Sequence, residues 1–331
     1  MRFLLVGNYG VGNLGDEMLR EYFLKAFPEV EWIVISANAG CPFDQLRAGR
    51  LQVAEVPRLP FGLRSFLTTP WWRTLFTLWN SDGMVFGGGT LLTDIESIKA
   101  PMLWWWHAFW ARLFRKKIIL AFQGIGPFRT RAGEWCSRWV VEHAECVIVR
   151  DDKSLKRISH WKNKKCVQSF DPAISLFDKE NSISQNERTK KVFIIIPRAN
   201  ATGMFLESSR EVYEKRKAEW SAVRIISLEP EDAAEQQICR RLSREFHALV
   251  TTPRTWKELQ DALQDASFLI TQRYHGAIAA LAMCIPFVTV PQMKGDKLAS
   301  IAHIHRDDAM RKMKEGEAAL RCVLSPSVYP L

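Results

Sequence analysis

The feature that most constrains the fold is a series of short, almost entirely apolar segments, each followed by a longer amphipathic stretch. Strands that are apolar on both faces and are separated by helices are typical of parallel sheets covered by helices on both sides. The sequence therefore predicts an α/β protein. The predicted strands are 2–6, 31–35, 83–86, 117–122, 146–149 and 166–170 in the first half of the chain, and 192–196, 224–228, 247–251, 267–271 and 286–290 in the second.

A polar segment separates these two series of strands. It covers residues 178–191 (DKENSISQNERTKK), and Ile183 is its one large apolar residue. Such a segment is typical of a linker. The chain of 331 residues is long enough for two domains. We therefore predict two doubly wound, Rossmann-like domains, 1–178 and 190–331, with a ligand-binding cleft between them at the carboxyl ends of the strands.

The charge and cysteine content narrow the class of protein. With 46 Lys and Arg against 36 Asp and Glu, the net charge is +10, which predicts attraction to anions. The 47% hydrophobic content excludes a disordered tail protein, a collagen-like fibre and a coiled coil. Seven cysteines without a C-x-x-C pair indicate reduced thiols and no zinc site.

The N-terminal apolar run is too short for a signal peptide, and 101–114 is too short to span a bilayer. We expect a cytoplasmic protein, and contact with the inner face of the cell membrane stays open.

Glycines and cations follow the predicted strands. Glycine lets a backbone approach a ligand closely, and a helix N-terminus offers unpaired N–H groups to an anion. We therefore predict that these loops bind a polyanionic small molecule, although any single loop is equally explained as an ordinary turn. The cations at strand ends are Arg150, Arg198, Arg273 and Lys297.

The first loop contains a literal G-x-G-x-x-G in Gly10, Gly12 and Gly15. A dinucleotide-binding domain also needs an acidic residue at the end of its second strand to hold the ribose. That strand is followed here by residues 36–38 (SAN), which contain no acid. The motif is therefore a weak sign of a nicotinamide dinucleotide. Asp16 either caps the following helix or contacts a ligand.

His275 is the most informative single residue. It lies two positions after Arg273, between a predicted strand and an apolar helix. A histidine there titrates near neutral pH and can transfer a proton, whereas a capping or core histidine is the structural alternative. His303 and His305 form an H-x-H, but no carboxylate or cysteine pattern accompanies them, so a metal site is not predicted.

Tryptophan is unusually frequent, with 13 residues, many of them in 71–79 and 104–110. Basic residues follow the second cluster at 112 and 115–117. Aromatic side chains beside basic ones suit a membrane interface or a sugar, and helix packing is the alternative. The chain shows no nucleic-acid-binding motif, so we expect no nucleic acid partner.

The loops together resemble those of the polysaccharide pyruvyl transferases. The resemblance extends from Gly7 to about Lys297. It depends on the order and spacing of the motifs more than on any one of them. The motifs are GNYGVGNLGDE at 7–17, GGGTLL at 87–92, QGIGP at 123–127, VRDDKS at 149–154, Asp171-Pro172 and RYHG at 273–276.

The resemblance implies a two-domain fold of the GT-B type and an enzyme that transfers pyruvate from phosphoenolpyruvate to a sugar as a ketal. The acceptor would be a sugar or lipid-linked oligosaccharide in exopolysaccharide, capsule or cell-wall synthesis. No metal or organic cofactor is implied. On the family pattern His275 is the general acid, and Arg273 and Arg150 hold the donor phosphate and carboxylate. The other implied substrate-binding residues are Asn8, Gly15, Asp16, Gly88, Gly89, Gln123, Asp171, Arg198 and Lys297.

Several alternatives stay open at this point. Lys294 and Lys297 compete for the donor-binding lysine of the family, and Asp16 and Asp171 compete as the base on the acceptor. A nucleotide-sugar glycosyltransferase with the same two-domain architecture is the second hypothesis. A non-catalytic scaffold of a polysaccharide assembly complex, held at a membrane surface by the tryptophan-rich segments, is the third.

Overall fold

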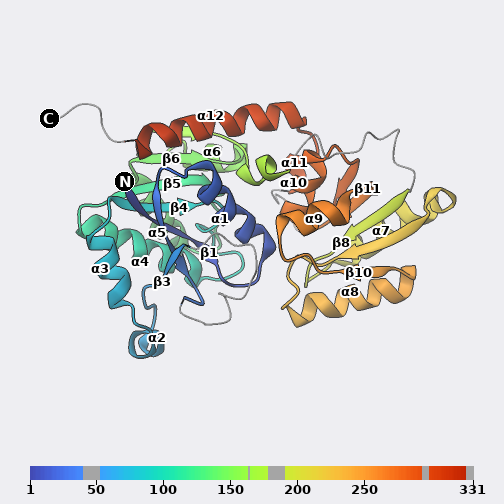
Figure 1. Cartoon of the computed structure of the whole chain (residues 1–331), viewed down its shortest axis with the longest axis horizontal. Helices are drawn as coiled ribbons and strands as arrows, with labels where there is room; N and C mark the ends of the chain where they lie inside the picture. The colour runs from blue at the N-terminus through green and yellow to red at the C-terminus, as the bar shows by residue number, and fades with distance from the viewer. Residues whose placement is uncertain (40–52, 163–164, 178–190, 293–297, 326–331) are drawn as a thin grey trace. The chain divides into compact units, whose positions relative to one another are not determined.

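The structure is a computed structural model, and it describes residues 1–39, 53–162, 165–177, 191–292 and 298–325 (Figure 1). The chain divides into two compact units. Unit 1 comprises Met1–Val11, Leu19–Pro172 and Arg311–Leu331, and unit 2 comprises Gly12–Met18 and Ala173–Met310. The segments 12–18 and 311–331 therefore belong to the unit on the other side of the predicted linker. The linker itself, except for Lys191, lies outside the described residues.

Unit 1 contains a seven-stranded sheet in which every pair of neighbouring strands is parallel. Its order is β3-β2-β1-β4-β5-β6-β7. The strands are β1 (Arg2–Tyr9), β2 (Glu31–Ser36), β3 (Ala54–Pro57), β4 (Gly83–Gly87), β5 (Lys117–Gln123), β6 (Cys146–Val149) and β7 (Cys166–Gln168). The helices are α1 (Leu14–Ala26), α2 (Leu63–Thr68), α3 (Trp72–Trp79), α4 (Lys99–Leu113), α5 (Arg131–His143), α6 (Asp152–Ile158) and α12 (Arg306–Leu324), of which α1 and α12 also contribute residues to unit 2.

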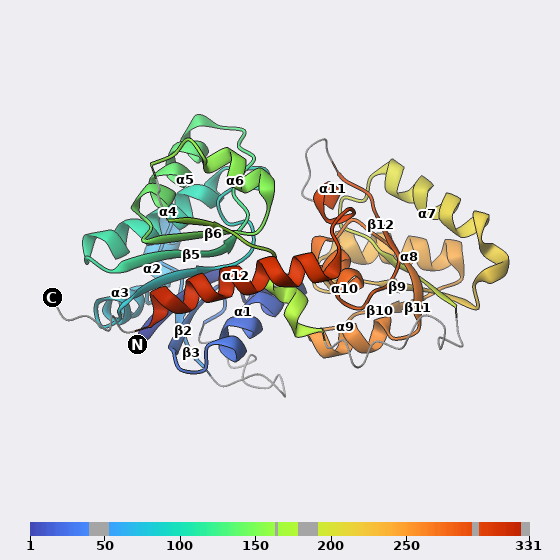
Figure 2. The same ribbon diagram turned by 90° about the horizontal axis from the view of Figure 1, so that it is seen from above.

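Helices cover both faces of this sheet, as Figure 2 shows, with α4 and α5 on one side and α1 and α12 on the other. Leu4 and Val6 of β1 pack in the cluster that contains Trp104 of α4 and Val140 of α5. On the opposite face, Phe23 of α1 packs against aromatic rings from β2 and β5. Successive side chains of a strand point to opposite faces. A strand between two helical layers therefore has to be apolar throughout, which is why the apolar runs predicted the strands.

Unit 2 contains a five-stranded parallel sheet in the order β10-β9-β8-β11-β12. The side chains of Thr202, Asp232 and Thr255 accept backbone N–H groups at the starts of three helices, where donors would otherwise lack partners. The strands are β8 (Val192–Ile196), β9 (Ala222–Ile226), β10 (Leu249–Thr251), β11 (Ala266–Thr271) and β12 (Phe287–Thr289). The α-helices are α7 (Gly203–Lys215), α8 (Ala233–Phe246), α9 (Trp256–Leu263), α10 (Tyr274–Ala282) and α11 (Leu298–Ile301), and Pro172–Leu176 and Lys217–Glu219 form 3₁₀ turns.

The predicted fold class is confirmed, because both sheets are parallel and doubly wound. Each predicted strand corresponds to an observed one, although β7 ends two residues early and β9 begins at Ala222. Strand β3 was not predicted. Within the part of the chain that the structure describes, it pairs only with β2 at the sheet edge, and it contains Glu55 and Pro57, so it lacks the apolar run that marks a central strand. No described helix is long and apolar enough to cross a bilayer.

The two tryptophan clusters have different surroundings. In α4, Trp104 is buried, and Trp105 packs against Trp135 and Trp139 of α5. The second cluster is thus largely explained by helix packing, the structural alternative. In α3, Trp72 and Trp79 are exposed.

His107 of α4 is fully buried and held as the neutral imidazole. Its Nε2 accepts a hydrogen bond from the Leu59 amide at 3.0 Å, and its Nδ1 lies 2.8 Å from the Leu103 carbonyl oxygen. An imidazole that accepts at one nitrogen and donates at the other is neutral. Burial, with a smaller effect of the Arg58 charge, lowers the pKa of His107 to about 4, against the opposing effect of the Leu103 carbonyl.

We expect the stability of unit 1 to depend on pH through His107. Its folded pKa is below its unfolded value, so its contribution is complete above about pH 6.5 and declines as the pH falls toward 4. The loss amounts to ~3 kcal/mol. Urea unfolding across this range should therefore show a flatter pH dependence for His107→Gln than for the wild type. The exposed His160 provides the control, since His160→Gln should keep the wild-type pH dependence. Parallel curves for wild type and His107→Gln would contradict the assignment.

Candidate functional site

Several of the predicted site residues lie at the ends of the strands where the strand order of each sheet reverses. In doubly wound sheets ligands bind beyond the carboxyl ends of the strands at this point. The reversal lies between β1 and β4 in unit 1 and between β8 and β11 in unit 2. Asn8 is the penultimate residue of β1, and Gly88 and Gly89 follow β4. Arg198 follows β8, and Arg273 follows β11.

In unit 2 the imidazole of His275 lies directly against the backbone of Gly15. A Cβ atom added to Gly15 would lie 1.9 Å from Nδ1 of His275, so a glycine is required at position 15 for the ring to occupy this place. His275 belongs to the first turn of α10, where backbone N–H groups lack helical partners. The ring is half-buried and perpendicular to Tyr274. The structure thus brings together two predicted residues that are 260 positions apart in the chain.

The Arg273 guanidinium is held by two carboxylates of unit 2. Nη2 of Arg273 lies 2.5 Å from Glu229 Oε2 and also contacts the buried Glu235. Burial alone would lower the pKa of Arg273, but the hydrogen bond to Glu229 and the charges of Glu235 and Glu229 raise it above its usual value. The Nε of Arg273 is buried and has no hydrogen-bond partner among the described residues. The cluster of one arginine and two glutamates carries an excess of formal negative charge.

Glu235 also orders the loop after β9. One of its oxygens accepts hydrogen bonds from the Ser227 hydroxyl and from the backbone amides of Leu228 and Glu229. Glu229 in turn accepts from Asn13 Nδ2 at 2.5 Å, and the Leu14 amide donates to the Leu228 carbonyl. The Gly12–Met18 segment is thus tied to the same loop that holds Arg273.

Asn13, not Asp16, provides the cap of α1. The Asn13 side-chain oxygen accepts the Gly15 amide at 2.9 Å, just before the helix begins at Leu14. Asp16 lies within the first turn and is half-buried. The capping alternative considered for Asp16 is therefore wrong, because the side chain one position before the helix already occupies that place. A carboxylate in the first turn still interacts favourably with the helix dipole.

Arg198 and Gln272, which follow β8 and β11, both form hydrogen bonds with uncharged side chains. Nη1 of Arg198 donates to Gln292 Oε1 at 3.1 Å, and Gln292 Nε2 donates to Asn200 Oδ1 at 2.5 Å. Gln272 donates to the Thr202 hydroxyl, and its Oε1 is buried without a partner among the described residues. Lys294 and Lys297 lie outside the described residues.

In unit 1 Arg150 and Asp171 form a fully buried ion pair. Arg150 Nη1 contacts Asp171 Oδ2, and Nη2 donates to the Thr90 hydroxyl at 2.7 Å. The two side chains are exposed by only 1% and 0%. The motifs at 87–92, 149–154 and 171–172 therefore meet at one point, where Arg150 joins them.

The remaining predicted residues of unit 1 shape the backbone. Gln123 is buried, and its Nε2 donates to the carbonyl oxygens of Phe86 and Gly88. Gly88 and Gly89 have φ angles of 77° and 80°, which favour glycine. Asn8 accepts a hydrogen bond from Arg58 at 3.0 Å. Gln123 thus fixes the path of the glycine-rich turn.

Four residues that hold the predicted ones in place were not predicted from the sequence: Asn13, Thr90, Glu229 and Glu235. Glu229 was detectable as an acid directly after a predicted strand. Glu235 was not, since it looks like an ordinary residue in the first turn of a helix. Among the described residues no group of three or more His, Cys, Asp or Glu is arranged to hold a metal ion.

Comparisons with known proteins identify the family and the fold. The family model described as polysaccharide pyruvyl transferase matches residues 13–292. No curated protein sequence matches the chain. The UDP-GlcNAc 2-epimerase of Methanocaldococcus jannaschii, solved with UDP-GlcNAc and UDP, is 12% identical with a TM-score of 0.58, covering 98% of this chain and 99% of that one. HepE of Anabaena, solved with UDP and glucose, is 9% identical with a TM-score of 0.63, covering 98% of each chain. At these identities the two structures show only that the fold is shared, a GT-B-like pair of Rossmann-like domains.

Proposed function

The chain belongs to the polysaccharide pyruvyl transferase family, and we propose that it transfers pyruvate from phosphoenolpyruvate to two hydroxyls of a sugar as a ketal. The acceptor would be a sugar or lipid-linked oligosaccharide of exopolysaccharide, capsule or cell-wall polymer synthesis. The observation that carries the proposal is His275, held against Gly15 in the first turn of α10 at the strand reversal of unit 2.

The proposed reaction needs an acid and a set of anion-binding groups. A proton transferred to the methylene carbon of phosphoenolpyruvate creates an oxocarbenium-like centre at C2. A sugar hydroxyl attacks this centre, the bond from C2 to the phosphate oxygen breaks, and inorganic phosphate leaves when a second hydroxyl closes the ketal. An imidazole titrates near the pH at which such a transfer is efficient. We assign the proton transfer to His275.

The two carboxylates beside Arg273 change how the donor would be bound. Because Glu229 and Glu235 already hold the Arg273 guanidinium, we propose that Arg198 and the N-terminal amides of α10 share with Arg273 the binding of the phosphate and carboxylate. Arg273 would contribute its Nε–H and would orient the adjoining turn. Arg150, which is paired with Asp171, is proposed to contact the donor anion as the family pattern implies.

The base on the acceptor is assigned to Asp16 in this proposal. Asp171 is completely buried and already accepts from Arg150, so it is poorly placed to receive a proton from a sugar hydroxyl. Asp16 is half-buried one position from Gly15 and is thus close to the His275 ring. Asn8, Gly88, Gly89 and Gln123 of unit 1 would contribute to acceptor binding. We also propose that Lys294 or Lys297 contacts the donor.

A thermal-shift experiment with phosphoenolpyruvate, UDP and NAD tests the donor. A ligand present at about a hundred times its Kd raises the free energy of unfolding by about 2.7 kcal/mol. We expect a shift with phosphoenolpyruvate that is lost in Arg198→Ala and kept in Arg210→Ala, whose side chain pairs with Glu245 on the surface of the same unit. A shift with UDP alone would contradict the proposal.

A nucleotide-sugar glycosyltransferase is the second candidate, because the structural relatives were solved with UDP or a UDP-sugar. UDP-dependent stabilisation and turnover of a UDP-sugar would support it. The scaffold hypothesis predicts no stabilisation by any of the three ligands.

We further propose a cytoplasmic location with peripheral contact to the inner face of the membrane, where lipid-linked acceptors reside.

A further inference from the structure

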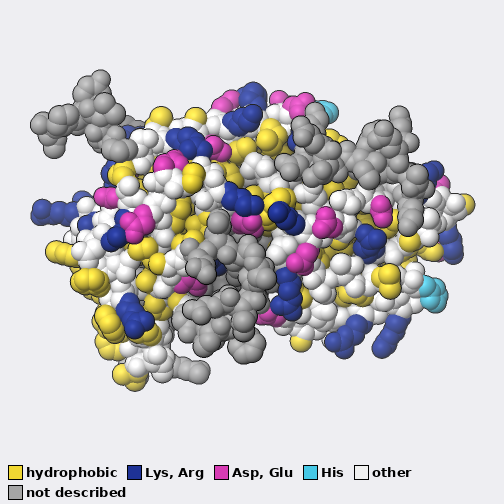
Figure 3. Space-filling view, in the orientation of Figure 1, with side chains coloured by type: hydrophobic (Ala, Val, Ile, Leu, Met, Phe, Trp, Pro, Cys, Tyr) yellow, Lys and Arg dark blue, Asp and Glu magenta, His cyan; other side chains and the backbone are white. Residues whose placement is uncertain are grey.

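One face of α3 exposes large aromatic side chains. Trp72, Phe76 and Trp79 are exposed by 60%, 69% and 61%, while Thr74 and Leu78 on the other side of the helix are buried. Spacings of four and three residues place the three rings in one stripe. A surface helix ordinarily directs polar residues outward. Figure 3 shows hydrophobic side chains, in yellow, gathered over α2 and α3.

Helix α2 extends this stripe. Phe66 and Leu67 are exposed by 51% and 74%, and Trp71 holds the turn between the helices by donating from Nε1 to the Phe66 carbonyl. We call Phe66, Leu67, Trp72, Phe76 and Trp79 the apolar face. A contiguous group of large exposed apolar residues marks an interaction site more often than a bare surface.

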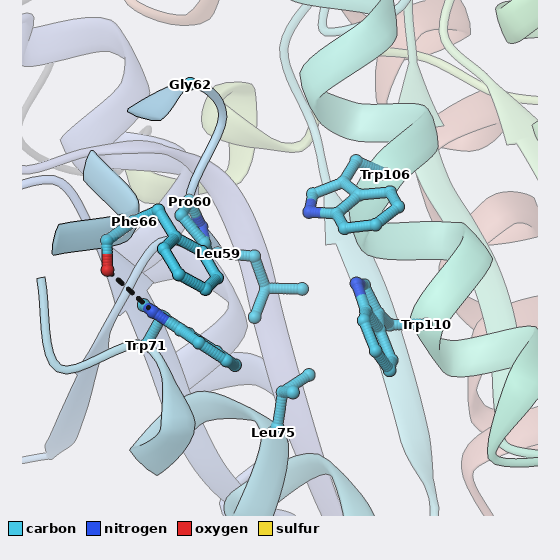
Figure 4. Close-up of a pocket in the computed structure, with 8 residues that line it drawn as sticks. All are labelled: Leu59, Pro60, Gly62, Phe66, Trp71, Leu75, Trp106 and Trp110. Carbon is cyan, nitrogen blue, oxygen red and sulfur yellow. Dashed lines mark hydrogen bonds between the residues drawn. The ribbon is translucent and has the colours of Figure 1, made fainter. Parts of the chain in front are cut away.

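A pocket of about 320 Å³ opens beside the apolar face. Figure 4 shows its lining, in which Phe66 and Trp71 face Trp106 and Trp110 of α4. None of the described side chains in this lining is charged. Trp106 directs its Nε1 toward the pocket, and this buried N–H has no partner among the described residues. The remaining lining residues are Leu59, Pro60, Gly62 and Leu75. Such a lining suits a hydrocarbon chain.

Arginines predominate around the apolar face, and Glu31, which lines a pocket together with Phe76, is paired with Arg2. No acidic residue occurs between Glu55 and Asp82, nor between Glu96 and Glu134. Arg73 is exposed on α3 with its guanidinium 5.5 Å from the Trp72 ring. Trp79 packs on Phe114 at 5.2 Å, which brings the C-terminal end of α4, where Arg112 and Arg115 are exposed, beside α3. Exposed arginines therefore flank the apolar face on the side of α4 and at Trp72.

We propose that the apolar face docks unit 1 on an anionic lipid bilayer, and that the pocket receives a hydrocarbon chain from it. Aromatic rings are stable at the depth of lipid headgroups, and nearby arginines bind anionic lipid. A second copy of this chain is a poorer occupant, because a two-fold interface would bring these arginines close to their own symmetry mates. The proposal goes beyond pyruvyl transfer and does not depend on it.

Co-sedimentation of the full chain with vesicles tests the proposal. Vesicles of phosphatidylcholine alone are compared with vesicles that also contain phosphatidylglycerol, and the variant is Trp72→Asp/Phe76→Asp. We expect the wild type to bind the anionic vesicles and the variant to lose about a hundredfold in partitioning, since each aromatic side chain contributes roughly tenfold. The matched control is Met204→Asp/Leu249→Asp, which alters side chains of unit 2 exposed by 62% and 78% and should bind like the wild type.

A second measurement tests the pocket. Vesicles with brominated acyl chains should quench part of the tryptophan fluorescence of the wild type, and Leu75→Trp, which fills the pocket, should abolish the quenching of Trp106 and Trp110. Equal binding by wild type and the Asp variant would overturn the proposal, as would no binding to anionic vesicles. The proposal would also be overturned if the wild type were a dimer, the Asp variant a monomer, and neither bound vesicles. The apolar face would then join two copies of the chain. Near-ultraviolet circular dichroism verifies that each variant is folded.

Discussion

Replacing His275 by Ala is expected to lower kcat for pyruvyl transfer from phosphoenolpyruvate by about 10²–10⁴-fold, the usual contribution of a positioned general acid. The imidazole is half-buried in the first turn of α10, and Ala is a good helix former, so the fold should be retained. Phosphate release and ketal formation on an acceptor extract measure the effect. Thermal stabilisation by phosphoenolpyruvate should largely persist, because proton transfer is not needed for binding.

The matched control is His303→Ala, which removes an exposed histidine from the same unit. It should keep wild-type kcat. If His275→Ala retained full turnover while the wild type was active, the assignment of the acid would be wrong although the pyruvyl transfer itself would stand.

Gly15→Ala provides an independent test of the same geometry. The added methyl would overlap the His275 ring, so the ring must move, whereas Gly15 has an ordinary backbone conformation that Ala adopts. Displacing a catalytic group by about 1 Å costs roughly 10²-fold in rate. We therefore expect a lower kcat with a nearly unchanged melting temperature. Wild-type kcat in Gly15→Ala would show that the ring position is not important.

Replacing Asp171 by Ala is expected to lower the free energy of unfolding by about 3–5 kcal/mol. The substitution leaves the Arg150 guanidinium charged and buried without its carboxylate partner. Urea unfolding followed by circular dichroism measures the loss. The surface pair of Arg138 and Glu142 serves as the control, and Arg138→Ala should change stability far less because this pair is largely exposed.

The double variant Arg150→Met/Asp171→Leu distinguishes stability from function. Replacing both partners of a buried ion pair by apolar side chains is often nearly neutral for stability. We therefore expect the double variant to be folded and to unfold close to the wild type, yet to be inactive if Arg150 binds a substrate anion. An active double variant would show that the pair serves only the fold.

The sequence by itself predicted the architecture, because a buried strand has an apolar composition that is visible within a few residues. A central strand covered on both faces must be apolar throughout, so β1, β4, β5, β8 and β11 were visible as short runs. The motifs at 7–17 and 273–276 predicted the family, which the family model confirms. The edge strand β3 was invisible, since one exposed side removes the constraint on its composition.

What only the tertiary structure decided is which charges are already paired. Arg150 and Arg273 looked like free cations after strands, but the fold buries each with a carboxylate distant in the chain, Asp171 and Glu235. It also separated two tryptophan clusters of similar composition into the packed helix α4 and the exposed stripe of α3. Composition records how apolar a segment is, whereas pairing and exposure depend on neighbours that the chain brings together only when it folds.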